Sequence, residues 1–138
     1  MKKIVFATKN PSKGKRFSEG LLEKGIQVLT CTDLQIELAI EENGKNAVEN
    51  ALLKARACYN KTNLPSFATD DALILENVPE EKQPGLFVRR VHGKTLNDEE
   101  MIAYYTDLVK KYGTDGKLDC KWVYGLAVIA ENGKESTY

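Results

Sequence analysis

Short apolar runs alternate with stretches of helical periodicity along this chain. Four consecutive apolar residues, Ile4 to Ala7, predict a buried strand, and Ile26 to Thr30 predicts a second one. Between them, Asn10 followed directly by a proline is typical of a helix start, and Gly25 is typical of its end. The opening segment therefore predicts a strand, a helix that runs to Lys24, and another strand.

Two later helices are indicated by their capping residues. Asn46 and Glu49 have the spacing of a capping box ahead of a helix that runs to about Tyr59, with its apolar residues on one stripe. Asn97 precedes three acidic residues, and two lysines and then Gly113 stand at the other end. That charge order matches the dipole of a helix.

The remaining apolar segments predict further strands. Pro65 to Ala68 is one, and Cys120 to Ala130 is the most strand-like segment of the chain. Asn132 and Gly133 then form a hairpin-turn pair, and a return strand would begin near Lys134. Since this strand has only some five residues, we expect a longer architecture of which the C-terminal part is missing. A short edge strand is the alternative.

The composition is typical of one soluble domain spanning residues 1–138, with 42% hydrophobic and 29% charged residues. Twenty basic and twenty acidic residues cancel, so no overall charge attracts nucleic acid or a membrane. The aromatic residues are not interleaved with the basic ones, which also disfavours nucleic-acid binding. Three widely spaced cysteines exclude a disulfide framework and favour a reducing cytoplasm. No apolar run is long enough to cross a bilayer.

The junction after the first strand is a candidate phosphate site. The start of a helix offers backbone N–H groups and the positive end of its dipole, and Lys13 adds an ammonium group. No acidic residue precedes Glu19, whereas six basic residues do. The alternative is an ordinary capped helix with a solvated basic face.

The adjacent carboxylates of Asp70 and Asp71 are a candidate metal site. Like charges so close together are unfavourable unless a cation lies between them. Oxygen ligands without histidine favour Mg²⁺ or Mn²⁺, the usual companions of nucleotide phosphates. Glu42 and Lys54 are two further candidates, although Glu42 is equally consistent with an acidic loop and Lys54 with a solvated helix face.

These residues occur in a characteristic order and spacing. The segments are Ala7-Thr8-Lys9-Asn10-x-x-Lys13, Glu42-x-Gly44-x-x-x-x-Glu49-Asn50-Ala51-x-x-Lys54-Ala55, Asp70-Asp71 and Pro84-Gly85-Leu86-Phe87-x-x-Arg90-x-x-Gly93. In this pattern the chain resembles the Ham1-like inosine/xanthosine triphosphate pyrophosphatases. The resemblance implies an α/β fold with a central mixed sheet flanked by helices. It also implies Mg²⁺-dependent hydrolysis of non-canonical purine nucleoside triphosphates (ITP, dITP, XTP) to the monophosphate and pyrophosphate, by a homodimer.

The resemblance assigns substrate contacts to matching positions only. Thr8, Asn10 and Lys13 would hold the triphosphate, and Lys54 would neutralise charge near the α-phosphate. Arg90, in the segment that follows the aspartates, would also contact the substrate.

The resemblance assigns the chemistry to three carboxylates. Glu42 and Asp71 would bind the metal, with Mn²⁺ as an alternative to Mg²⁺. Asp71 would activate the attacking water, and Asp70 would support the metal or that water. Phosphoryl transfer needs mainly such positioning and charge neutralisation.

The chain also departs from the family pattern. Ala72 and Leu73 replace a serine and a glycine beside the proposed base, and the family's later Phe-Gly-Tyr-Asp and Ser-His-Arg segments do not occur. These departures leave a second functional interpretation open: a shortened relative that binds nucleotide or phosphate with weak catalysis or none.

Overall fold

Three parallel strands form one side of a five-stranded mixed sheet. β1 (Lys2–Phe6) pairs with β2 (Ile26–Thr30) on one side and with β3 (Ser66–Leu75) on the other. β6 (Cys120–Ile129) follows β3, and β7 (Glu135–Thr137) pairs antiparallel with β6 at the edge. The strand order is β2-β1-β3-β6-β7. This confirms the predicted mixed sheet and the predicted hairpin.

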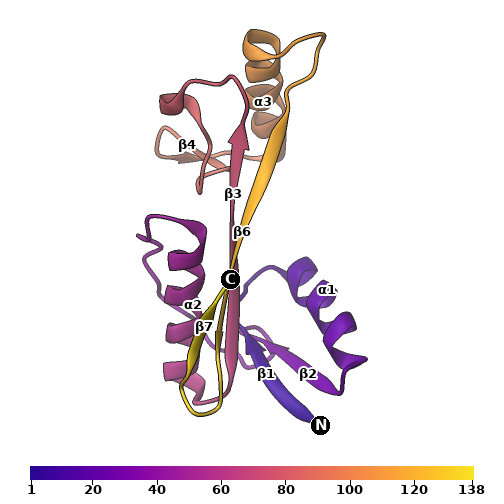
Figure 1. Cartoon of the computed structure of the whole chain (residues 1–138), viewed down its shortest axis with the longest axis vertical. Coiled ribbons are helices and arrows are strands. Elements are labelled where there is room, and N and C mark those ends of the chain that lie inside the picture. Colours follow the sequence, from indigo (N-terminus) through magenta and orange to yellow (C-terminus); the bar gives the residue numbers. More distant parts are fainter. The chain divides into compact units, whose positions relative to one another are not determined.

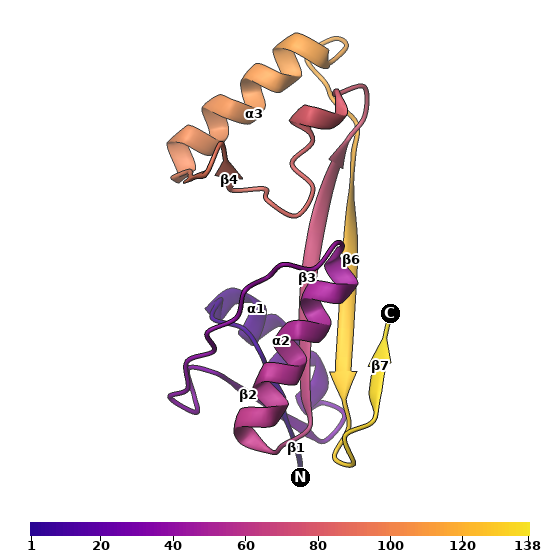
Figure 2. The same cartoon turned by 90° about the vertical axis from the view of Figure 1, so that its left-hand side faces the viewer.

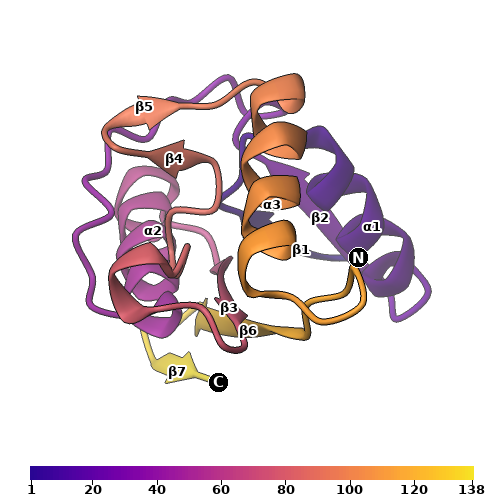
Figure 3. The ribbon, with the colours of Figure 1, turned by 90° about the horizontal axis from the view of Figure 1, so that it is seen from above.

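Two helices cover opposite faces of the three parallel strands (Figures 1 and 3). α1 (Pro11–Leu22) connects β1 to β2, and α2 (Ala47–Thr62) connects β2 to β3. Because β2 and β3 lie on opposite sides of β1, the two crossovers run in opposite directions, and right-handed crossovers then place their helices on opposite faces.

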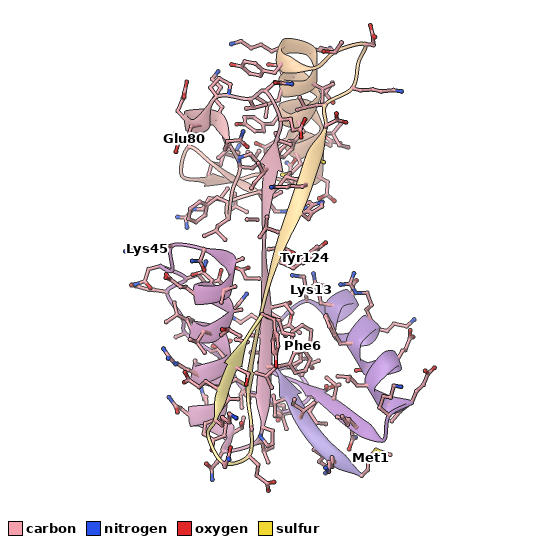
Figure 4. All side chains as sticks on the ribbon, in the orientation of Figure 1. Met1, Phe6, Lys13, Lys45, Glu80 and Tyr124 are labelled. Carbon is pink, nitrogen blue, oxygen red and sulfur yellow. The ribbon has the colours of Figure 1, made fainter.

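Successive side chains of β1 point to opposite faces of the sheet, so β1 contributes to a hydrophobic core on each face. Val5 points toward α2, where it packs against Ala51. Phe6, labelled in Figure 4, points to the face that α1 covers. Its ring stacks on Phe67 with centroids 4.3 Å apart and meets the edge of Phe17 at 5.0 Å. Burial on both faces thus explains the unbroken apolar run from Ile4 to Ala7.

The helix caps agree with the sequence pattern. Asn46 accepts a hydrogen bond from the backbone N–H of Glu49 at 2.9 Å, and Glu49 accepts one from the N–H of Lys45 at 2.6 Å. The Glu49 side chain thus accepts from the N–H of the residue before the N-cap Asn46, and not from that of Asn46 itself as in a standard capping box. Asn97 and Glu100 form a complete capping box.

The computed structural model describes residues 1–138, which divide into two compact units. The first comprises residues 1–70 and 124–138, and the second comprises residues 71–123. None of the helices is both long and apolar enough to span a membrane.

The second unit contains the remaining helix, α3 (Asp98–Tyr112), seen side-on in Figure 2. β4 (Arg90–Val91) and β5 (Lys94–Thr95) form a small hairpin in this unit, and residues 80–82 form a short 3-10 helix. The second unit has its own core, made of Leu73, Leu75, Val78 and Leu108.

β3 is longer than the sequence predicts. The predicted strand ended at Ala68, before the aspartates, but β3 continues through Asp70 and Asp71 to Leu75. The polar pair Asp70-Asp71 predicts a strand end, although the apolar residues after it resume the strand pattern. The two aspartates therefore lie within the strand and not in a loop.

Candidate active site

The loop between β1 and α1 is closed by its own side chains. Asn10 accepts hydrogen bonds from the N–H groups of Ser12 and Lys13, at 3.0 and 3.3 Å. The hydroxyl oxygen of Thr8 accepts one from the N–H of Asn10 at 3.1 Å. The expectation of free N–H groups for an anion is therefore wrong, because Asn10 is an effective N-cap. The Nδ2 amide of Asn10 and the side chains of Thr8 and Lys13 are the groups that an anion would contact.

Lys54 lies between two carboxylates of the first unit. Its ammonium nitrogen is 3.3 Å from Oδ1 of Asp70 and 3.5 Å from Oε1 of Glu42. The side chains of Lys54 and Asp70 are each 15% exposed, and that of Glu42 is 48% exposed. The interpretation of Lys54 as a solvated residue is therefore wrong. α2 instead points it at Asp70, in the middle of β3.

Glu42 is positioned by a loop that is tied to α2. The N–H of Gly44 donates to Oδ1 of the buried Asn50 at 2.8 Å. A Cβ atom at Gly44 would come within 2.5 Å of that oxygen and 2.8 Å of Cβ of Glu49. Gly44 and Asn50 belong to the segment that resembles the family, but the sequence pattern predicts no role for them. One sequence signal could have indicated it: Asn50 is a polar amide that stands among the apolar positions of the predicted helix.

The substitution Gly44→Ala is expected to destabilise the protein by about 1–3 kcal/mol, because the added methyl group displaces the buried Asn50 amide and breaks its partly buried hydrogen bond to the N–H of residue 44. Urea denaturation would measure the change. Gly20→Ala is the matched control, since no atom lies within 4 Å of a Cβ there. In a helix interior that change is expected to be stabilising by roughly 0.5–1 kcal/mol. Equal stability of the two variants would contradict the assigned role of Gly44.

Five of the predicted site residues line one cavity of about 360 Å³. They are Thr8, Asn10, Lys13, Glu42 and Lys54. The cavity lies at the carboxyl ends of β1 and β2, where the two crossover connections lead to opposite faces of the sheet. Ligands of open α/β sheets bind at such switch points. Cys31, Leu38 and Ile40 add a less polar wall, which sequence reasoning missed.

The two aspartates do not share a face of β3. Successive side chains of a strand point to opposite faces, so Asp70 faces α2 and Asp71 points the other way. The like-charge reason for a metal between them therefore does not apply. Asp70 and Glu42 instead share one cation, the ammonium group of Lys54. Asp71 and Arg90 belong to the second unit.

The donor set of the first unit fits a hard divalent cation. Oxygen atoms of Glu42 and Asp70 already approach one positive charge, the ammonium group of Lys54. No three His, Cys, Asp or Glu side chains are grouped so that they could hold a metal ion by themselves. Mg²⁺ is commonly held by one or two carboxylates together with substrate phosphates and water. The residues therefore fit a metal that a phosphate ligand completes.

The cavity cysteine is not a candidate nucleophile. Cys31 and Cys58 are buried thiols, and burial raises the pKa of both, that of Cys58 to about 11. A thiol with so high a pKa forms little of the nucleophilic thiolate at neutral pH. The chemistry available to the cavity is therefore that of its lysines, its threonine hydroxyls and the Glu42 carboxylate, which suits a polyanionic ligand and a metal ion.

Comparison with known proteins places the chain in a family. The sequence model of the Ham1 family matches residues 4–137. A dITP/XTP pyrophosphatase of Leptospira interrogans is 38% identical over 98 residues, which are 71% of this chain and 49% of the relative. This chain thus spans about half the length of that relative. A dITP/XTP pyrophosphatase of Oceanobacillus iheyensis is 32% identical and is matched over 100% of this chain and 68% of its own length.

The structural comparison agrees with the sequence comparison. The structure of a HAM1 protein from Coxiella burnetii superimposes with a TM-score of 0.79 at 29% identity. The superposition covers 99% of this chain and 68% of the Coxiella chain. The five-stranded mixed sheet with its flanking helices is therefore the Ham1 fold, and the chain belongs to the Ham1 family.

Proposed function

We propose that this protein hydrolyses non-canonical purine nucleoside triphosphates such as ITP, dITP and XTP to the monophosphate and pyrophosphate. The observation that carries the proposal is the cavity in which Lys13 and Lys54 meet Glu42 beside the β1–α1 loop. Two cations and a carboxylate at one switch point suit a triphosphate accompanied by a metal ion. The two relatives named as dITP/XTP pyrophosphatases support the same activity.

The proposed substrate contacts follow the cavity lining. The Thr8 hydroxyl, the Asn10 amide and the Lys13 ammonium bind the triphosphate oxygens. Lys54, which leaves its carboxylate partners, neutralises charge at the α-phosphate. Arg90 of the second unit is proposed as a further substrate contact on the resemblance of its segment.

The chemical step is the attack of water on the α-phosphorus. Asp71 accepts the proton of the water, the new P–O bond forms, and the bond between the α-phosphorus and the bridging oxygen breaks, so that pyrophosphate leaves. Mg²⁺ or Mn²⁺ would supply positive charge to the phosphate oxygens. Glu42 and Asp70, whose oxygens both approach the Lys54 ammonium, would hold it, and Asp71 is proposed as a further metal ligand on the resemblance of its segment. We also propose that the protein is cytoplasmic and acts as a homodimer. Light scattering of the purified chain would test the oligomeric state.

A second candidate function is nucleotide or phosphate binding with weak catalysis or none. The observation that favours it is the sequence after the aspartates, where Ala72 and Leu73 replace the family's serine and glycine. A missing hydroxyl beside the base would weaken orientation of the water but would leave the cavity lysines in place.

Calorimetry and product analysis together test the proposal. We expect ITP to bind more tightly with Mg²⁺ than with EDTA, because the metal and the triphosphate each supply charge that the other needs. Inosine monophosphate and pyrophosphate should then appear in equal amounts. Equal affinity in Mg²⁺ and EDTA would reject the metal site. Coupled binding without pyrophosphate release would favour the second candidate.

A further inference from the structure

The ammonium group of Lys54 takes the position of a cation between Glu42 and Asp70. We infer that Lys54 holds this position until a triphosphate arrives, and so makes binding of the divalent metal conditional on binding of the substrate. The inference rests on the proposed function, since it concerns the same cavity. It assigns Lys54 a role in the substrate-free protein that is distinct from contact with the substrate.

The ammonium group and a divalent metal would compete for the same two carboxylate oxygens. The Lys54 ammonium lies 3.3 and 3.5 Å from the two carboxylate oxygens. A divalent metal binds carboxylate oxygens at roughly 2.0–2.6 Å. A metal ion at that distance from the same oxygens would lie against the ammonium group, and the two like charges would repel each other. A metal that uses both of these oxygens therefore displaces the ammonium group.

Burial makes that movement unfavourable in the absence of another anion. The Lys54 side chain is 15% exposed, and α2 is anchored next to it by Ala51 and Ala55, which are fully buried. A largely buried ammonium group that loses its carboxylate partners pays a desolvation penalty. Phosphate oxygens in the same cavity would replace those partners. Release of Glu42 to the metal is thus coupled to arrival of a polyanion at Lys54, and the coupling is reciprocal.

Removal of the ammonium group should uncouple the two ligands. We expect Lys54→Met, which keeps an unbranched side chain without charge, to bind Mn²⁺ alone about tenfold or more tightly than the parent protein, as a coupling of ordinary size predicts. Electron paramagnetic resonance of free Mn²⁺, with no nucleotide present, would measure the affinity. This readout does not depend on catalysis.

Two matched variants separate the inference from general charge effects. Lys54→Arg keeps a cation between the carboxylates and should bind Mn²⁺ as weakly as the parent does. Lys24→Met removes one positive charge in the exposed turn between α1 and β2 and should leave the Mn²⁺ affinity unchanged. An equal gain in Lys24→Met and Lys54→Met would overturn the inference, as would no gain in Lys54→Met.

Lys54→Met leaves two carboxylates without their cation and could therefore fold poorly. Thermal unfolding in the presence of Mn²⁺ tests the inference in that event. In that case Mn²⁺ should restore folding of this variant at concentrations that leave the parent's Tm unchanged. No such restoration would also overturn the inference. Absence of ITP hydrolysis in the parent, with the metal affinities as expected, would instead reject only the proposed function.

Discussion

Asp71→Asn is expected to lower the turnover of ITP on the order of 10²-fold or more, while substrate affinity changes little. Asparagine keeps the size of the side chain and one acceptor oxygen, but it cannot take a proton from water at neutral pH. Pyrophosphate release under saturating substrate would measure turnover, and calorimetry with the variant would measure affinity. A loss in turnover alone would identify Asp71 as the base.

Lys13→Ala is the contrasting variant. It removes a phosphate contact that exists in the ground state as well as in the transition state, so KM should rise at least as much as kcat falls. Asp70→Asn tests the assignment within the aspartate pair. Wild-type turnover in Asp71→Asn together with a loss in Asp70→Asn would reverse that assignment. Unchanged pyrophosphate release in both would leave the hydrolase proposal without its chemistry.

Phe6→Ala is expected to lower the free energy of unfolding of the first unit by about 3–5 kcal/mol, since a large buried side chain is replaced by a cavity. Phe6 is 1% exposed and contacts the rings of both Phe17 and Phe67. A loss of that size is a large part of the stability of an ordinary domain. Urea denaturation followed by circular dichroism would measure it.

Phe87→Ala is the control for this experiment, because Phe87 is 55% exposed. The same change in side-chain size at this surface position should alter stability by less than about 0.5 kcal/mol. If both variants unfold at the same urea concentration, the aromatic cluster around Phe6 does not carry the stability assigned to it.

Most of the secondary structure follows from local sequence. β2 has its predicted bounds, α1 begins at the predicted proline, and α3 has its predicted caps. These features depend on residues a few positions apart: N-cap side chains, charges along the helix dipole and the length of apolar runs. The family membership likewise follows from the spacing of short motifs, and the matching family model confirms it.

The extent of β3 could not be read locally. Asp70 and Asp71 are poor strand residues by propensity, yet the strand continues through them to Leu75. Partners remote in the sequence decide this, because Leu73 and Leu75 pack into the core of the second unit and Asp70 is neutralised by Lys54 of α2. Context of this kind overrides propensity, and it also leads to the opposite orientation of the two aspartates.

By itself, the sequence determined the strand–helix order, the caps of the helices and the residue types of the candidate site. Only the tertiary structure decided that the Lys54 ammonium lies between Glu42 and Asp70, and that Asn50 accepts a hydrogen bond from the N–H of Gly44. Lys54 is separated from its carboxylate partners by 12 and 16 positions along the chain, and these contacts form only when α2 packs on the sheet. Caps and periodicity arise from neighbours along the chain, whereas the charge pairing of the site arises from the crossover that brings distant segments together.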